Sequence, residues 1–246
     1  MGNGMQVEFS LRRLRRTLAV TTALIAALGL AAELCDHLWA PAWAATTVPL
    51  LSLSYEVNLP TWYVVCLHAA CALGCALAAT HARADGAPHG TRWGVLAGLF
   101  AYVSADELIQ IHEAASGWFD TGGLLYFGWI IPAAVVVVAL GLWFVPFLRA
   151  LPPATRRRFV TAGGIFVGGA LLMELPLGWW TERAGADNLV YALIDWVEET
   201  LELAGVTLFL CALVSHLAGA RPGPDGLDPS APDRVTLTLG PATPPG

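Results

Sequence analysis

Apolar positions dominate the chain in six long stretches, which short polar segments separate. Each stretch holds about 20 mostly apolar residues, the length that an α-helix needs to cross ~30 Å of hydrocarbon. Little sequence remains outside them for a soluble domain. The pattern therefore predicts an all-α, polytopic membrane protein, a six-transmembrane-helix bundle. The predicted spans are residues 17–38, 61–82, 93–116, 124–148, 159–180 and 189–218.

The basic residues are all arginines, and they fall on one side of this topology. Of the 13, only Arg183 lies on the other side. Because cytoplasmic loops carry the excess of basic residues, we expect both termini in the cytoplasm and the protein in a bacterial inner membrane. The chain then divides into a basic segment (1–16), a transmembrane domain (17–218) and a Pro/Gly-rich cytoplasmic tail (219–246), for which we expect disorder.

The first apolar stretch has a second interpretation, as a secretory signal peptide. The "APAWAA" that follows it contains an A-x-A cleavage pattern at residues 42–44. Against this interpretation, the stretch is long, and Glu33, Asp36 and His37 lie just before the pattern. We expect the segment to remain as a membrane helix.

Composition agrees with a membrane location. The chain is 56% hydrophobic and 13% charged, whereas about a quarter of the residues of a soluble domain are charged. The net charge of −6 does not suggest a nucleic-acid partner. The five cysteines are odd in number and lie within or beside the apolar stretches, so no disulfide framework is expected.

Acidic residues enter the predicted spans at a common depth. Counted along the alternating spans, Glu33, Glu174 and Asp195 each lie ~10 Å below the outer surface, in one layer with Asp106 and His68. None of the arginines lies in a span, and charges at membrane depth are costly unless they are paired or functional. The carboxylates in the spans are Glu33, Asp36, Asp106, Glu107, Glu113, Glu174, Asp195, Glu198, Glu199 and Glu202.

Helical spacing places these acids on faces that can point into the bundle. Glu33 and His37 share one face of the first span. Asp106, Gln110 and Glu113 share one face of the third. The sixth span carries a stripe opposite an apolar side, formed by Tyr191, Asp195, Glu198, Glu199 and Glu202.

Such a cluster is tolerable if the acids bind metal cations, are protonated or line a water-filled cavity. A plainer interpretation lets the acids nearest the span ends reach the headgroups. Many carboxylates with a few histidines suit a hard ion, so iron or manganese is favoured over zinc or copper. We predict metal ligands among Glu33, His37, Asp106, His112, Glu113, Glu174, Asp195, Glu199 and Glu202, with His68, Gln110, Tyr191 and Glu198 supporting them.

These ligands favour a membrane metalloprotein, an iron-carboxylate oxidoreductase whose apolar, lipid-like or quinone-like substrate comes from the bilayer. The number of carboxylate and histidine ligands is comparable to that of di-iron bundles, although the Glu-x-x-His spacing of those proteins is missing. An alternative is a proton- or divalent-cation-coupled transporter that uses the same acids. Against it, the inner halves of the spans carry no comparable acids. A metal-dependent membrane hydrolase and a structural subunit also remain open.

Two local features of the fifth span indicate a built site. Pro176 cannot donate to the carbonyl of Leu172, so we expect the helix to kink beside Glu174. The run "GGIFVGG" places Gly164 and Gly168 at a spacing that allows close helix packing.

Two short blocks of sequence carry a resemblance. "DELIQIHE" (106–113) and "EETLELAG" (198–205) together resemble segments of uncharacterised bacterial multi-pass membrane proteins. The resemblance implies a family of membrane proteins and brings no activity with it.

Overall fold

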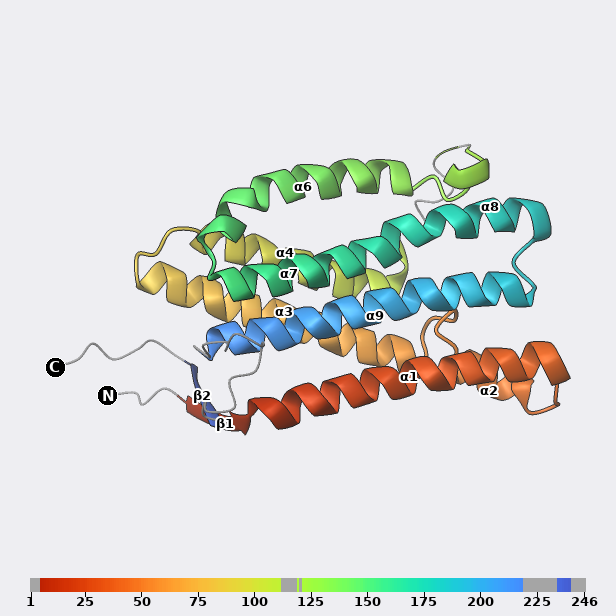
Figure 1. The fold of residues 1–246 in the computed structure, drawn as a ribbon, viewed down its shortest axis with the longest axis horizontal. Helices are drawn as coiled ribbons and strands as arrows, with labels where there is room; N and C mark the ends of the chain where they lie inside the picture. Colours follow the sequence, from red (N-terminus) through yellow and green to blue (C-terminus); the bar gives the residue numbers. More distant parts are fainter. Residues whose placement is uncertain (1–4, 112–118, 120, 219–233, 240–246) are drawn as a thin grey trace.

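A computed structural model describes residues 5–111, 119, 121–218 and 234–239. The long helices lie side by side along one axis as an up-and-down bundle (Figure 1). In chain order the elements are β1 (Met5–Ser10), α1 (Leu11–Trp39), α2 (Ala44–Leu51), α3 (Leu59–Ala84), α4 (Gly90–Ile109), the 3₁₀ turn η1 (Gly123–Leu125), α6 (Ile130–Ala150), α7 (Pro153–Val167), the π-helical η2 (Gly168–Met173), α8 (Glu174–Ala184), α9 (Leu189–Leu217) and β2 (Arg234–Leu239).

Five of the helical segments are long and apolar enough to cross a membrane. They agree with the first, second, fourth, fifth and sixth predicted spans, usually with a few more residues at each end. The multi-pass helical architecture is thus confirmed. The five segments are Leu11–Trp39, Leu59–Ala84, Ile130–Ala150, Pro153–Ala184 and Leu189–Leu217.

The third predicted span differs from the structure at its C-terminal end. α4 ends at Ile109, and Gln110 adopts a left-handed conformation (φ 57°, ψ 47°) from which its N–H donates to the Asp106 carbonyl at 2.7 Å. This is a helix C-cap, so the prediction that one helical face continues from Asp106 through Gln110 is wrong. Glu113, the third member of that face, lies outside the described residues.

A short segment between the first two long helices was not predicted. α2 packs on α1, where Ala44 and Val48 join Ala32 in a small apolar cluster. Beyond it, Asn58 ties the loop to α3: its side chain donates to the Ser52 carbonyl at 2.7 Å and accepts from the Thr61 N–H at 3.0 Å. The loop of residues 52–58 is thereby held against the bundle.

The main apolar core lies around the C-terminal half of α9, which packs against α1, α3 and α7 (Figure 1). Leu203, Val206 and Leu213 are fully buried there, next to Cys71 and Cys75 of α3. All five cysteines are free thiols, as the sequence predicted.

The helix from α7 to α8 departs from α geometry beside Glu174. Residues Gly168–Met173 form a π-helical turn directly before that acid, and Pro176 follows two residues later. Because proline cannot donate to the preceding turn, a wider turn here agrees with the predicted irregularity.

Close packing of this helix on α9 uses different glycines from those predicted. A Cβ at Gly169 would lie 2.8 Å from the Glu198 carbonyl oxygen, and one at Gly205 would lie 2.7 Å from the Phe166 backbone nitrogen. Gly164 and Gly168 have no such neighbour within 4 Å, so the prediction for that pair is wrong. The face of this helix that meets α9 therefore contains Gly169 and not the neighbouring Gly168.

Two short strands, one from each end of the described sequence, form a two-stranded ribbon. β1 pairs with β2 in antiparallel register, with Met5 opposite Leu239 and Ser10 opposite Arg234. Part of the segment for which the sequence predicts disorder is therefore a strand. The rest of that segment lies outside the described residues, and disorder there stays a prediction.

Candidate functional site: a carboxyl cluster at one end of the bundle

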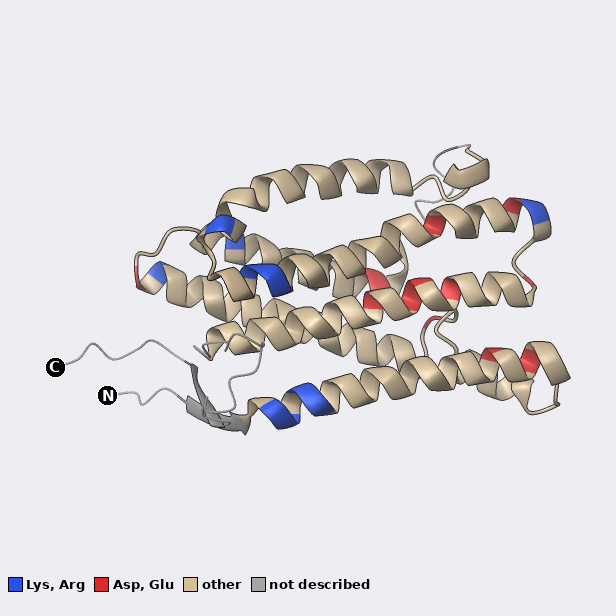
Figure 2. Ribbon diagram, viewed as in Figure 1, with Lys and Arg blue, Asp and Glu red and all other residues tan. Residues whose placement is uncertain are grey.

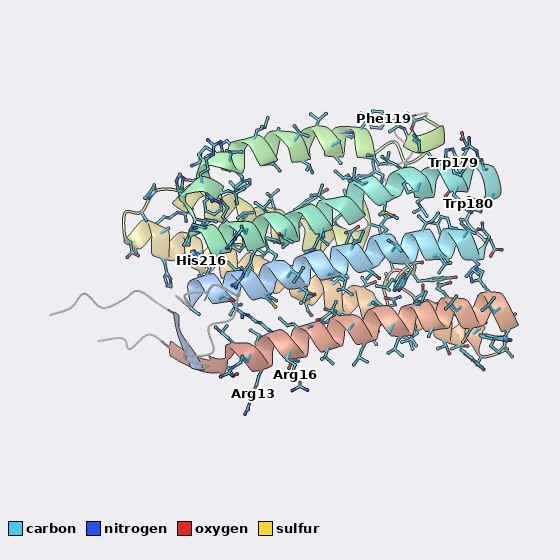
Figure 3. All side chains as sticks on the ribbon, in the orientation of Figure 1. Arg13, Arg16, Phe119, Trp179, Trp180 and His216 are labelled. Carbon is cyan, nitrogen blue, oxygen red and sulfur yellow. The ribbon has the colours of Figure 1, made fainter. Side chains whose placement is uncertain are left out.

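Charge is separated along the bundle axis. Figure 2 shows arginines where α1 and α7 begin, and acids over the first half of α9, on α8 and near the end of α1. Arg13 and Arg16 lie at the end opposite Trp179 and Trp180 (Figure 3). The predicted segregation of acids from arginines is present along the described helices.

The stripe on α9 supplies four neighbouring carboxylates. Asp195, Glu198, Glu199 and Glu202 occupy consecutive turns, and their charges interact with one another. Glu198 is buried, with 7% of its surface exposed, and the other three are half-buried. The helix therefore presents one acidic face to the bundle.

α8 adds a carboxylate that a tryptophan orients. Glu174 is buried, and its Oε1 accepts a hydrogen bond from Trp129 Nε1 at 3.1 Å. Its charge interacts with those of Glu198 and Glu202 across the helix pair. The close approach at Gly169 is what brings the two helices near enough for this contact.

Two further acids join from elements outside the predicted ligand set. Glu107 of α4 interacts with Glu199 and Glu202, and Glu56 from the loop after α2 interacts with Glu199. Asp106, which was the predicted ligand on α4, interacts with Tyr102 of its own helix. Glu56 lies between predicted spans, so its depth could not be inferred from hydropathy.

α1 contributes the pair that spacing predicted. Glu33 is 4% exposed, and His37 Nδ1 lies 3.0 Å from the Glu33 carbonyl oxygen and 3.6 Å from its Oε2. Glu33 is also near Asp195, beside which Ser54 lies without hydrogen-bonding geometry. α1 and α9 thus meet at this acid layer.

Some buried polar atoms in the cluster lack a partner. Asp195 Oδ2, Glu198 Oε2, Thr200 Oγ1 and Ser54 Oγ have no hydrogen bond within the part of the chain that the structure describes. Such atoms are rare in folded proteins because each has lost its hydration without compensation. These atoms are therefore the least satisfied part of the cluster.

The predicted ligands are only partly brought together. Among the described residues, no three His, Cys, Asp or Glu side chains are grouped closely enough to hold one metal ion. His112 and Glu113 lie outside the described residues. Tyr191, at the first turn of α9, and Gln110, at the end of α4, are half-buried.

His68 lies in an aromatic environment. Its ring is fully buried, 6.1 Å from the Phe100 centroid and 5.7 Å from that of Phe166. The Val64 carbonyl is near, but neither ring nitrogen forms a hydrogen bond within the described structure. The expected support of the carboxylates by His68 is not seen.

Helical spans with an internal acid layer define the class: this is a multi-pass helical membrane protein. Residues 16–217 match the domain of unknown function DUF8692, and the chain belongs to that family. No match was found among curated proteins or among solved structures. The resemblance to an uncharacterised family is confirmed, and the match brings no activity with it.

Proposed function

We propose that this chain is an integral membrane metalloprotein that binds a metal ion at its carboxyl cluster and oxidises an apolar, lipid-like or quinone-like substrate. The cluster includes Asp195, Glu198, Glu199 and Glu202 of α9, Glu174 of α8, Glu107 of α4, Glu33 of α1 and Glu56.

The proposed orientation has the arginine end in the cytoplasm and the acid end at the outer face of a bacterial inner membrane. Arginine excess marks the cytoplasmic side, and tryptophans such as Trp179 and Trp180 are common at membrane interfaces. α4 is the proposed third span, which completes a set of six with the five apolar segments. It carries Arg92, Asp106 and Glu107 within its 20 residues. It packs along α3.

One observation carries the proposal: Asp195 Oδ2 and Glu198 Oε2 are buried without a hydrogen-bond partner among the described residues. Neither side chain forms an ion pair there, and their charges repel each other. Uncompensated anions at this depth destabilise the fold, so each of these acids needs a bound proton or a metal ion.

A hard divalent ion fits the donor set, because carboxylate oxygens outnumber the one described histidine near them, His37. Iron or manganese is favoured over zinc or copper for this reason. A metal site requires the carboxylates to rotate toward a common point, since no three are grouped around one position in the described structure. His112 and Glu113 stay proposed ligands.

Elemental mass spectrometry of the detergent-purified protein tests the proposal. We expect stoichiometric iron or manganese in the parent and its loss in a Glu198→Gln, Glu199→Gln double variant. Asp187→Asn is the matched control, because Asp187 is an exposed acid at the same end of the bundle. No metal in any of the three, after reconstitution with iron and manganese, contradicts the proposal.

A second candidate is a proton- or divalent-cation-coupled transporter. It is favoured by the ungrouped arrangement of the described carboxylates, because protons bind to carboxyl groups one at a time and need no common centre. Metal-free protein that takes up protons in liposomes, and loses this activity in Glu198→Gln, would favour the transporter.

A further inference from the structure

A cavity of about 220 Å³ lies in the apolar half of the bundle, between α4, α6, α7 and α9. Its wall is almost entirely apolar, and it contains Gly163 of α7 as well as Gly205 and Val206 of α9. Six phenylalanines contribute to the wall: Phe100, Phe144, Phe147, Phe159, Phe166 and Phe209.

The cavity lies directly next to the carboxyl cluster. On α9, Glu202 precedes the wall residues Gly205 and Val206 by one helical turn, so it shares their face. On the facing helix, Phe166 lies against Gly205, and Gly169 lies against Glu202. An apolar molecule in the cavity therefore reaches within one turn of the acids.

The wall favours a planar ring over a saturated chain. Its phenylalanines are already held by ring contacts, with the Phe209 centroid 4.5 Å from that of Phe159 and 4.6 Å from that of Phe100. Flat aromatic faces pack well on another ring. An apolar cavity of about 150 Å³ is enough for benzene, so this volume has room for a substituted ring.

His68 supplies the polar part of the argument. The ring contacts Phe100 and Phe166, two residues of the wall, and it is fully buried. Neither nitrogen has a hydrogen-bond partner in the described structure. His68 lies behind the wall and is not itself a wall residue, so a ring oxygen reaches it once the Phe100 or Phe166 ring turns aside. A hydrocarbon chain would leave this group unsatisfied, whereas that oxygen would complete it.

We propose that this cavity binds a ring of the quinone class, and that His68 hydrogen bonds to one of the ring's oxygens. The proposal rests on the function proposed above in that it names the substrate class, but the binding itself needs no metal. His68 acts here as a binding residue, and the carboxyl cluster is the neighbouring site.

Binding of duroquinone to the full-length protein in detergent, measured by calorimetry, tests the cavity. Gly163→Leu should fill it, because Gly163 is part of the wall and no atom lies within 4 Å of the position of an added Cβ. Gly164→Leu is the matched control: it is equally free of neighbours but is not in the wall. We expect Gly163→Leu to abolish binding and Gly164→Leu to retain it.

The role of His68 is tested with durene, the same ring without oxygens. The parent should bind duroquinone about tenfold more tightly than durene, and His68→Leu should remove that preference. Equal affinity for the two rings in the parent, or displacement of duroquinone by oleate with no effect of His68→Leu, would make the cavity a lipid-tail site and overturn the proposal.

The Glu198→Gln, Glu199→Gln variant separates this proposal from the metal site. Loss of metal with duroquinone binding retained supports both proposals. Metal in the parent without duroquinone binding overturns the quinone site alone, and duroquinone binding to a protein that takes up no metal overturns the metal site alone.

Discussion

The two halves of α9 differ in how completely their side chains are satisfied. The half after Glu202 buries Leu203, Val206 and Leu213 in close contact with neighbouring helices. The half before it contains Asp195 and Glu198, whose buried oxygens have no partner in the described structure. A single helix thus has one half built for stability and one half that sacrifices stability, which is the pattern expected of a functional site.

The largest effect is expected where α7 meets α9. Gly205→Val places side-chain atoms against the Phe166 backbone, which cannot move aside as a side-chain tip can. We expect a loss of at least about 3 kcal/mol in the free energy of unfolding. Denaturation in mixed micelles measures it, and Gly163→Ala, which meets open space, should leave stability nearly unchanged.

A smaller loss of stability is expected when a buried side chain is shortened in the same half of α9. Leu213→Ala removes a fully buried side chain that fits against Gly74 of α3. We expect a loss of about 2 kcal/mol, from lost packing and the remaining cavity. The exposed Leu208→Ala is the control. Equal effects of the two substitutions in the same denaturation assay would mean that this half is not closely packed.

The acid half should respond in the opposite direction. In metal-free protein, Glu198→Gln removes a buried acid that neighbouring acids repel whenever it ionises, and puts a neutral side chain of the same shape in its place. We expect stability to rise by about 1 kcal/mol. A fall in the melting temperature of the metal-free variant would contradict this account of the cluster.

The smallest effect is expected at the loop that carries Glu56. Asn58→Ala removes the cap of α3 and the hydrogen bond to the Ser52 carbonyl. We expect a loss of about 1 kcal/mol. Hydrogen exchange should show faster exchange confined to residues 52–61; a uniform increase over the whole bundle would mean that the loop is not held locally.

The spans could be predicted because hydropathy depends on neighbouring residues in the sequence. The pair Glu33 and His37 and the stripe on α9 could be predicted for the same reason, since helical spacing sets both. The end of α4 at Gln110 could not, because nothing in the surrounding residues, neither glycine nor proline, marks a left-handed cap there.

The rest of the cluster depends on contacts between distant segments. Trp129 lies 45 positions before Glu174, and no local pattern indicates their hydrogen bond. Glu56 lies near the other acids only because α2 and its loop fold back on the bundle. His68 lies away from the acids because its ring packs against Phe100 and Phe166. Hydropathy indicates the depth of Glu174 and His68 but not that of Glu56, and depth alone does not specify a neighbour.

The π-helical turn at Gly168–Met173 also sets the angular phase of everything that follows it. A π turn accommodates an additional residue compared with an α turn, and one residue corresponds to about 100° of rotation around a helix axis. Deleting a single residue there would restore a regular helix while turning Glu174 away from Trp129 and from α9. The acid layer is therefore sensitive to an insertion or deletion that would leave the hydropathy of the span unchanged.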